Sequence, residues 1–162
     1  MRVVEYNIEL NEYGNNILVK EKSCNYTALE KSYCFTSPDK IASFCKNYFR
    51  ADKKAEEYLW LLALNTKNKL IGCFKVSHGT VNASLVGKRE IFIRLLLCGA
   101  VNGIVVHNHP SGDPTPSKDD FTTTTALVEA GKLLNCQILD HIIIGKDSAY
   151  SICCNESFDI ND

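Results

Sequence analysis

An apolar run that ends in two histidines constrains the fold of this chain more than any other segment. Residues 103–106 read Gly-Ile-Val-Val, and such a β-branched apolar run favours a buried β-strand. His107 and His109 follow two positions apart, so both side chains are expected on one face where the strand ends. Pro110 cannot donate a hydrogen bond to a sheet and is expected to end the strand. The sequence therefore predicts a pair of imidazoles at the end of a buried strand.

A capped helix is expected to follow this strand after a short loop. Ser117 precedes the acidic stretch Lys118-Asp119-Asp120, and the Ser-x-x-Asp spacing is typical of a helix start. Such a cap fixes the path of the chain out of the loop, so Asp120 can fold back toward the histidines. Taken singly, the pieces also have a structural explanation, because Ser-x-x-Asp is an ordinary cap and Pro-Ser-Gly-Asp-Pro an ordinary turn.

Two imidazoles and one carboxylate match the ligand set of a catalytic zinc site. Zinc binds neutral imidazole nitrogen and carboxylate oxygen in tetrahedral geometry, and catalytic sites keep three protein ligands and one open position. His107, His109 and Asp120 fit that count. The ligand types favour zinc over manganese or iron. The sequence thus predicts a zinc hydrolase, in which the metal activates water and polarises a carbonyl group.

Such a hydrolase also needs a general base, a carboxylate near the metal that is not a ligand. Glu56, Glu57 and Glu90 are the candidates. Glu56 and Glu57 open an apolar run, and neighbouring residues on a strand point to opposite faces, so a shift of one residue exchanges them. Glu90 lies in an expected helix, where a solvated or capping carboxylate is its more ordinary role.

Hydrophobic periodicity predicts alternating strands and helices, which indicates an α/β fold. Residues 2–22 are expected to form a β-hairpin, and residues 23–36 are polar and irregular. Four threonines at 122–125 are poor helix formers, yet the Ser117 cap and the apolar residues after them favour a helix. Helices are expected at 37–49, 88–98 and 118–134, and further strands at 57–65, 69–77, 137–144 and 148–153.

The composition of the whole chain excludes some classes of protein. With 162 residues, 45% of them hydrophobic, the chain suits a single globular domain. No apolar run approaches the length of about 20 residues that spans a membrane, and the N-terminus lacks the apolar core of a signal peptide. The eight cysteines include no Cys-x-x-Cys pair, so we expect most of them to be free and buried. A cytoplasmic protein without a membrane partner is therefore expected.

The combined pattern is similar to that of a known family. His107-x-His109-Pro110 followed by Ser117-x-x-Asp120 resembles the JAMM motif of the JAB/MPN metalloprotease superfamily. The form found here, His-Asn-His-Pro-Ser-Gly-Asp-Pro, resembles the RadC-like branch, and the resemblance extends over roughly residues 37–152. Four flanking segments also resemble motifs of that branch: Leu-Asn-Thr-Lys-Asn at 64–68, Gly-Thr-Val-Asn-Ala-Ser at 79–84, Arg-Glu-Ile-Phe at 89–92 and Leu-Asp-His-Ile-Ile-Ile-Gly at 139–145.

This resemblance implies a particular kind of α/β fold. It is a mixed, partly antiparallel sheet flanked by helices, of the JAB/MPN type within the cytidine deaminase-like class. The RadC-like JAB/MPN domain is expected over residues 37–162. Residues 1–36 are expected to form a β-rich N-terminal extension.

The resemblance also implies a chemistry and a role for single residues. His107, His109 and Asp120 would bind Zn²⁺. Glu57, at the start of an early strand, would be the general base, and Ser117 would help to hold the oxyanion. The implied reaction is hydrolysis of a peptide or isopeptide bond in a protein or peptide substrate.

Two other functions stay open from the sequence. The family name is linked to DNA repair and recombination, and an accessory or nuclease-like role would use a basic surface such as Lys67, Lys69, Lys88 and Arg89. The formal net charge of −1 gives no overall electrostatic footprint for nucleic acid. The third function is a binding module with a structural zinc ion, although such a site would normally show four protein ligands.

Five further polar residues have weaker functional interpretations. His141 would line the substrate cleft or simply bond its neighbours at a strand end, and His78 would form a cleft wall or a solvated turn. Asn82 and Ser84 could bond an extended substrate or serve local turns. Asn108 is expected to face away from the metal, as packing or as support for the ligands.

Overall fold

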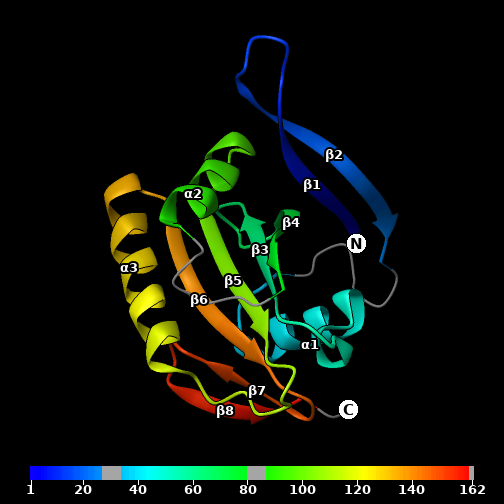
Figure 1. Cartoon of the computed structure of the whole chain (residues 1–162), viewed down its shortest axis with the longest axis vertical. Helices are drawn as coiled ribbons and strands as arrows, with labels where there is room; N and C mark the ends of the chain where they lie inside the picture. The colour runs from blue at the N-terminus through cyan, green and yellow to red at the C-terminus, as the bar shows by residue number, and fades with distance from the viewer. Residues whose placement is uncertain (27–33, 80–86, 161–162) are drawn as a thin grey trace.

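A computed structural model describes residues 1–26, 34–79 and 87–160 of the chain. One eight-stranded sheet runs through all of this part, in the order β2-β1-β4-β3-β5-β6-β7-β8 (Figure 1). Three α-helices and one short 3₁₀ helix accompany it. The elements are β1 (Arg2–Leu10), β2 (Asn16–Asn25), α1 (Pro38–Phe49), η1 (Ala51–Lys53), β3 (Tyr58–Leu64), β4 (Leu70–His78), α2 (Lys88–Leu97), β5 (Asn102–Asn108), α3 (Lys118–Leu134), β6 (Gln137–Ile144), β7 (Ser148–Ser151) and β8 (Glu156–Asp159).

The sheet is mixed, as the fold class predicts. Strand β3 lies at its centre and pairs antiparallel with both β4 and β5. Strand β5 runs parallel to β6 because α3 makes the crossover between them, whereas β6, β7 and β8 are antiparallel neighbours. Strand β1 pairs antiparallel with β2 and parallel with β4.

Helices cover both faces of the sheet, and the alternation along β3 shows how. Trp60, Leu62 and Leu64 pack with the buried residues of α1 on one face. Leu59 and Leu61 pack with α2 and α3 on the other face. This double cover explains why β3 and β5 are almost continuously buried. The described chain is a single α/β domain.

The helices predicted from the sequence agree with the structure within a residue or two. The threonine run is helical as predicted, and three of its hydroxyl groups donate to carbonyl groups four residues earlier, Thr122 to Lys118, Thr124 to Asp120 and Thr125 to Phe121.

Two stretches of strand differ from the prediction. Strand β2 continues to Asn25, past the predicted hairpin end and into the stretch expected to be irregular, because β1 offers pairing partners as far as Arg2. The strand expected at 148–153 ends at Ser151, and a turn with Asn155 in the left-handed region leads into an unpredicted strand, β8.

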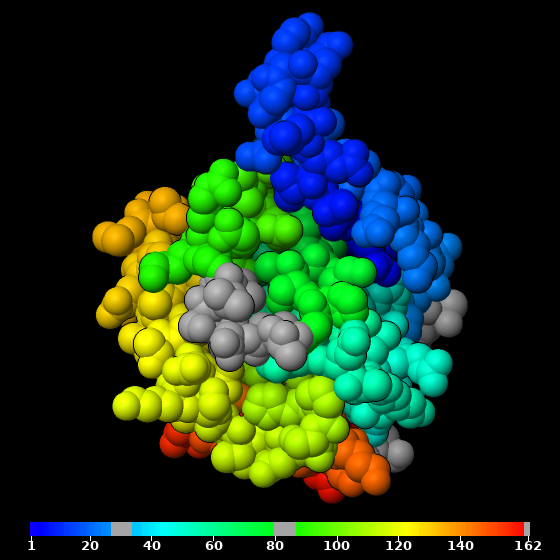
Figure 2. All heavy atoms as spheres, viewed as in Figure 1, coloured from blue at the N-terminus to red at the C-terminus, as the bar shows by residue number. Residues whose placement is uncertain are grey.

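The N-terminal hairpin is continuous with the sheet through β1 and β4, and its tip projects beyond the body of the molecule (Figure 2). Leu10 and Tyr13 are exposed there. None of the eight cysteines forms a disulfide bond. Across the three described segments, none of the helices combines the length and the apolar character that crossing a membrane requires.

Candidate metal centre

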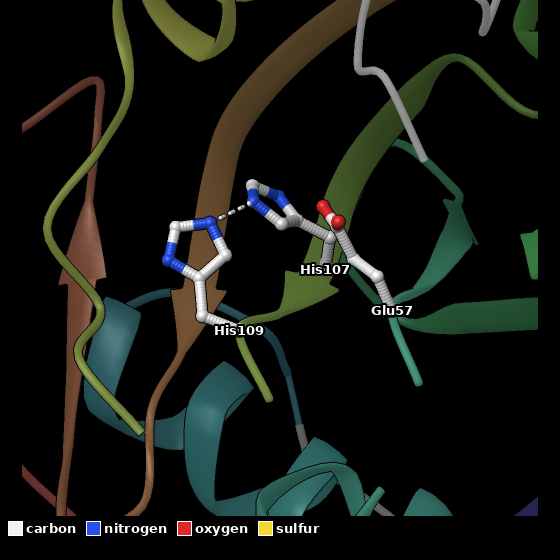
Figure 3. A group of neighbouring side chains, drawn as sticks. All are labelled: Glu57, His107 and His109. Atoms are coloured by element: carbon white, nitrogen blue, oxygen red, sulfur yellow. Dashed lines mark hydrogen bonds between the residues drawn. The ribbon is translucent and has the colours of Figure 1, made fainter. Parts of the chain in front are cut away.

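The end of β5 places both histidines of the sequence motif. His107 pairs with Leu59 of β3 and with Ile143 of β6, and its side chain is only 1% exposed. His109 lies one residue beyond the strand, where its backbone N–H donates to the carbonyl of Ile144 at 2.9 Å. The two rings turn toward one another, with their Nε2 atoms 3.0 Å apart (Figure 3).

Glu57 comes from the neighbouring strand and joins the pair. It precedes β3, and the Gly79 N–H donates to its carbonyl at 3.0 Å, which continues the pairing with β4. By the alternation of β3 its side chain lies on the face of Leu59, the face that also carries His107. One donor atom each from Glu57, His107 and His109 lie within 4.8 Å of one another. The adjacent Glu56 instead pairs with His78 at 2.6 Å.

Asp120 approaches the histidines from the first turn of α3. Ser117 caps this helix: its Oγ accepts the Asp120 N–H at 3.2 Å, and its own N–H and O–H donate to Asp120 Oδ2 at 2.7 and 2.6 Å. The other carboxylate oxygen, Oδ1, lies 3.5 Å from His107 Nε2, and Oδ2 lies 3.9 Å from His109 Nε2. The capping box therefore turns the Asp120 carboxylate toward both rings.

Hydrogen bonds determine which nitrogen of each ring carries the proton. His109 Nδ1 lies 2.8 Å from the carbonyl oxygen of Asp113, which can only accept, so the proton of neutral His109 is on Nδ1. Its Nε2 therefore carries a lone pair.

His107 belongs to a longer chain of hydrogen bonds. Its Nδ1 lies 2.8 Å from His141 Nε2, and His141 Nδ1 lies 2.6 Å from Thr124 Oγ1. Thr124 donates its single hydroxyl proton to the Asp120 carbonyl at 2.7 Å, so its oxygen accepts from His141, and His141 in turn accepts from His107. The reverse order would take the Thr124 proton away from the Asp120 carbonyl. Every polar group in this series of hydrogen bonds is satisfied when His107 is protonated on Nδ1.

The consequence is that two Nε2 lone pairs face each other across 3.0 Å, beside the carboxylates of Asp120 and Glu57. Such an arrangement is repulsive unless a cation lies between the donors. Two nitrogens bound tetrahedrally to zinc are about 3.3 Å apart, given Zn–N bonds of 2.0–2.1 Å. The donor set and its spacing thus fit a zinc ion.

Burial sets the protonation of these groups. It lowers the pKa of His141 to about 3 and that of His107 well below its ordinary value, so both rings are neutral at pH 7. Burial also raises the pKa of Glu57, with His109 lowering it and Asp120 raising it. Neutral imidazoles suit metal binding, and a carboxylate with a raised pKa suits proton transfer.

A surface hollow of about 310 Å³ opens beside Glu57. It is lined by Ala55, Glu56, Glu57, Gly79 and Pro110. Glu57 therefore lies at the wall of a hollow near the start of β3 and the end of β4.

Other sequence candidates lie elsewhere. Glu90 pairs with Arg89 in the first turn of α2. His141 is fully buried and bonds the His107 ring, so it does not line a cleft. Asn82 and Ser84 lie outside the described residues.

Sequence reasoning missed Thr124, which ends the hydrogen-bond chain from His107 through His141. The available signal was its spacing: it lies four residues after Asp120 and therefore on the same helix face.

Comparison with known proteins identifies the family of this chain. The family model described as RadC-like JAB domain matches residues 35–157. A UPF0758 protein of Alkaliphilus metalliredigens is 43% identical over 131 residues, which are 81% of this chain and 56% of that protein. For a UPF0758 protein of Methanosarcina acetivorans the identity is 48% over 111 residues, or 68% of this chain and 48% of that protein. The chain thus spans about half the length of the curated relatives it matches. It belongs to the RadC-like JAB domain family.

Proposed function

We propose that this chain is a zinc-dependent hydrolase that cleaves a peptide or isopeptide bond in a protein or peptide substrate. The observation that carries the proposal is the pair of facing Nε2 atoms, 3.0 Å apart, with two carboxylates beside them. A structural zinc site would be closed by four tightly placed ligands, whereas Glu57 lies at the wall of an open hollow.

Each of these residues has its own role in the proposed reaction. His107, His109 and Asp120 would hold the metal, and when bound it would make hydroxide available near neutral pH and polarise a carbonyl. Glu57 accepts the proton of the attacking water and returns it to the leaving amine, a task that its raised pKa favours. Ser117 holds Asp120 Oδ2, and it can donate to an oxyanion only by giving up that bond, because it has one proton.

Metal content tests the first half of the proposal. Purified wild-type protein, reconstituted with zinc, is expected to carry about one zinc ion per chain by elemental analysis. His107→Ala and His109→Ala are expected to lose it while circular dichroism shows a folded protein. His78→Ala is the matched control, because His78 is exposed and pairs with Glu56 outside the centre. Absence of zinc from the wild-type protein would contradict the proposal.

Activity tests the second half. A panel of peptides and isopeptide-linked conjugates is screened with the zinc-loaded protein, and cleavage is followed by mass spectrometry. Glu57→Gln is expected to lower the rate on any substrate found by about 100-fold or more, since general base catalysis contributes about that much. Glu56→Gln is expected to change it little, because Glu56 bonds His78 instead. Equal losses in both variants would exclude Glu57 as the base.

A role on DNA is the second candidate function, and one observation favours it. A second hollow, of about 380 Å³, is lined by four cationic side chains, Lys22, Arg50, Lys54 and Lys75, by four aromatic ones and by the carboxylates of Glu5 and Glu21. None of the basic residues expected from the sequence lines this hollow: Lys67 and Lys69 lie between β3 and β4, and Lys88 and Arg89 open α2.

Binding of a fluorescent single-stranded oligonucleotide at several salt concentrations tests the DNA role. If DNA binds in this hollow, Lys54→Glu and Lys75→Glu weaken binding and flatten its salt dependence, and Lys67→Glu does not. Salt-independent or undetectable binding leaves the hydrolase as the function to pursue.

A further inference from the structure

Asn108 stands between the two histidines, yet its side chain points to the opposite face of the sheet. It is 1% exposed, and on β5 it shares the face of Val106, which packs toward α1. Its side-chain amide makes two hydrogen bonds: Oδ1 accepts from the N–H of Tyr58 at 2.9 Å, and Nδ2 donates to the carbonyl of Glu56 at 3.0 Å. These two backbone groups flank Glu57.

The position of these bonds matters because the ladder between β3 and β5 ends at Leu59 and His107. Beyond that pair, the Asn108 amide takes the place of a backbone partner for the strand that carries Glu57. On the other side, the Glu57 carbonyl accepts from Gly79. The backbone of three consecutive residues, 56 to 58, is thereby fixed on both sides.

Glu57 depends on this backbone support more than the histidines do. Among the described residues its carboxylate has no hydrogen-bond or ion-pair partner, whereas both histidines are bonded through Nδ1. No hydrogen bond therefore orients this carboxylate, and the backbone of residues 56 to 58 determines from where the side chain extends. An amide also supplies its acceptor and its donor on two separate atoms, while aspartate would turn a second acceptor toward the Glu56 carbonyl.

We propose that Asn108 is the positioning residue for Glu57: its amide clamps the backbone on both sides of the glutamate and holds the carboxylate against the His107–His109 pair. The clamp joins segments 50 residues apart in the sequence and couples the base to the same strand that carries the histidines. This inference rests on the proposed zinc hydrolase.

A double-mutant cycle on zinc affinity tests it. Zinc binding is measured by competition with a chromophoric chelator for wild type, Asn108→Ala, Glu57→Gln and the double variant. Glu57 is not a ligand in the proposed site, but a donor atom of its carboxylate lies within 4.8 Å of those of both histidines, so its negative charge would stabilise a bound cation. If Asn108 acts through Glu57, Asn108→Ala therefore weakens zinc binding by about 10-fold in the wild-type background, the lower end of what groups around the ligands contribute. In the Glu57→Gln background the same change is expected to alter it less than twofold. Asn102→Ala is the matched control, because Asn102 bonds Asn68 at the other end of β5.

Amide hydrogen exchange of the metal-free protein gives a readout that needs neither zinc nor a substrate. Asn108→Ala is expected to speed exchange at Tyr58 by at least about 10-fold and to leave Leu61, deeper in β3, unchanged. If the alanine variant does not fold, Asn108→Asp replaces it: it keeps the acceptor for Tyr58, loses the donor to Glu56, and should show coupling of the same sign to Glu57→Gln.

The outcomes distinguish failure of the proposed zinc hydrolase from failure of the positioning role of Asn108. A wild-type protein that binds no zinc refutes the proposed function. Zinc binding with an equal loss in both backgrounds, or with no loss at Asn108→Ala, overturns the positioning role. Unchanged exchange at Tyr58 overturns the clamp itself.

Discussion

Two buried aspartates, Asp140 and Asp120, show how differently this fold treats a carboxylate. Asp140 on β6 is 5% exposed and receives three hydrogen bonds, from Ser151 Oγ and from the backbone N–H groups of His141 and Cys153. Asp120 is 3% exposed, and Ser117 supplies its side-chain bonds at Oδ2 only. Its Oδ1 faces His107 Nε2, an atom that carries a lone pair in the satisfied arrangement.

The difference separates a structural polar cluster from a ligand site. Buried polar groups are normally paired within the protein, and both oxygens of Asp140 meet that expectation. Asp120 and the histidines do not, because their unpaired oxygen and nitrogens converge on one point. Asp140 and His141 are consecutive on β6, so the two clusters lie on opposite faces of the same strand. Burial alone therefore does not identify a metal site. Such a site is indicated where several buried acceptor atoms converge and no donor proton is available to pair them.

The largest effects are expected from exchanging the two aspartates for alanine. Asp120→Ala should weaken zinc binding by about 100-fold or more, since it removes a ligand. Asp140→Ala should lower the free energy of unfolding by about 3 kcal/mol, because three buried donors lose their acceptor. Chelator competition and urea unfolding in EDTA measure the two quantities. Equal loss of zinc binding in both variants would show that Asp120 and Asp140 do not differ as ligand and structural residue.

The pH dependence of the metal-free protein tests the neutral histidines. His107 and His141 have folded pKa values below their unfolded value, so the folded state binds fewer protons. Stability is therefore fully present above about pH 6.5 and is lost as pH falls toward 3, by about 1.4 kcal/mol per pH unit for each histidine. Urea unfolding in EDTA between pH 7 and 5 measures the slope, and His141→Gln should reduce it. A flat profile would mean that neither ring is held neutral.

Much of this architecture follows from local sequence. The Ser117 capping box, the helix of α3 and the paired histidines depend on neighbours within a few residues, so spacing alone predicts them. The distinction between Glu56 and Glu57 depends on the phase of β3, which the structure sets by its pairing with His107 and Gly79.

The rest depends on register between segments far apart in the chain. Nothing near Asn108 indicates that its amide will meet residues 56 and 58. The spacing of Thr124 places it on the helix face of Asp120, but that spacing does not indicate the bond to His141. Strand β8 is likewise formed by pairing with β7 and has weak alternation of its own. Tertiary pairing decided each of these features.

Thr124→Val is expected to weaken zinc binding less than Asp120→Ala does. Valine keeps the shape of the side chain and removes the acceptor for His141 Nδ1, so the tautomers of His141 and His107 are no longer fixed. Zinc affinity is expected to fall by about 10-fold, as for other groups that orient a ligand. Thr125→Val is the matched control, because its exposed hydroxyl bonds only the Phe121 carbonyl. Similar affinities for the two variants would show that the relay does not orient His107.

The smallest expected difference is between two serines that each donate to a buried aspartate. Ser151 Oγ lies 2.7 Å from Asp140 Oδ2, and Ser117 Oγ lies 2.6 Å from Asp120 Oδ2. Replacing either by alanine should cost about 1 kcal/mol of unfolding free energy, one as a lost buried hydrogen bond and the other as a lost helix cap. Only Ser117→Ala should also weaken zinc binding, by a few fold, because the Asp120 carboxylate then rotates more freely. If Ser151→Ala weakens zinc binding as much, the two clusters communicate through β6 and are not independent.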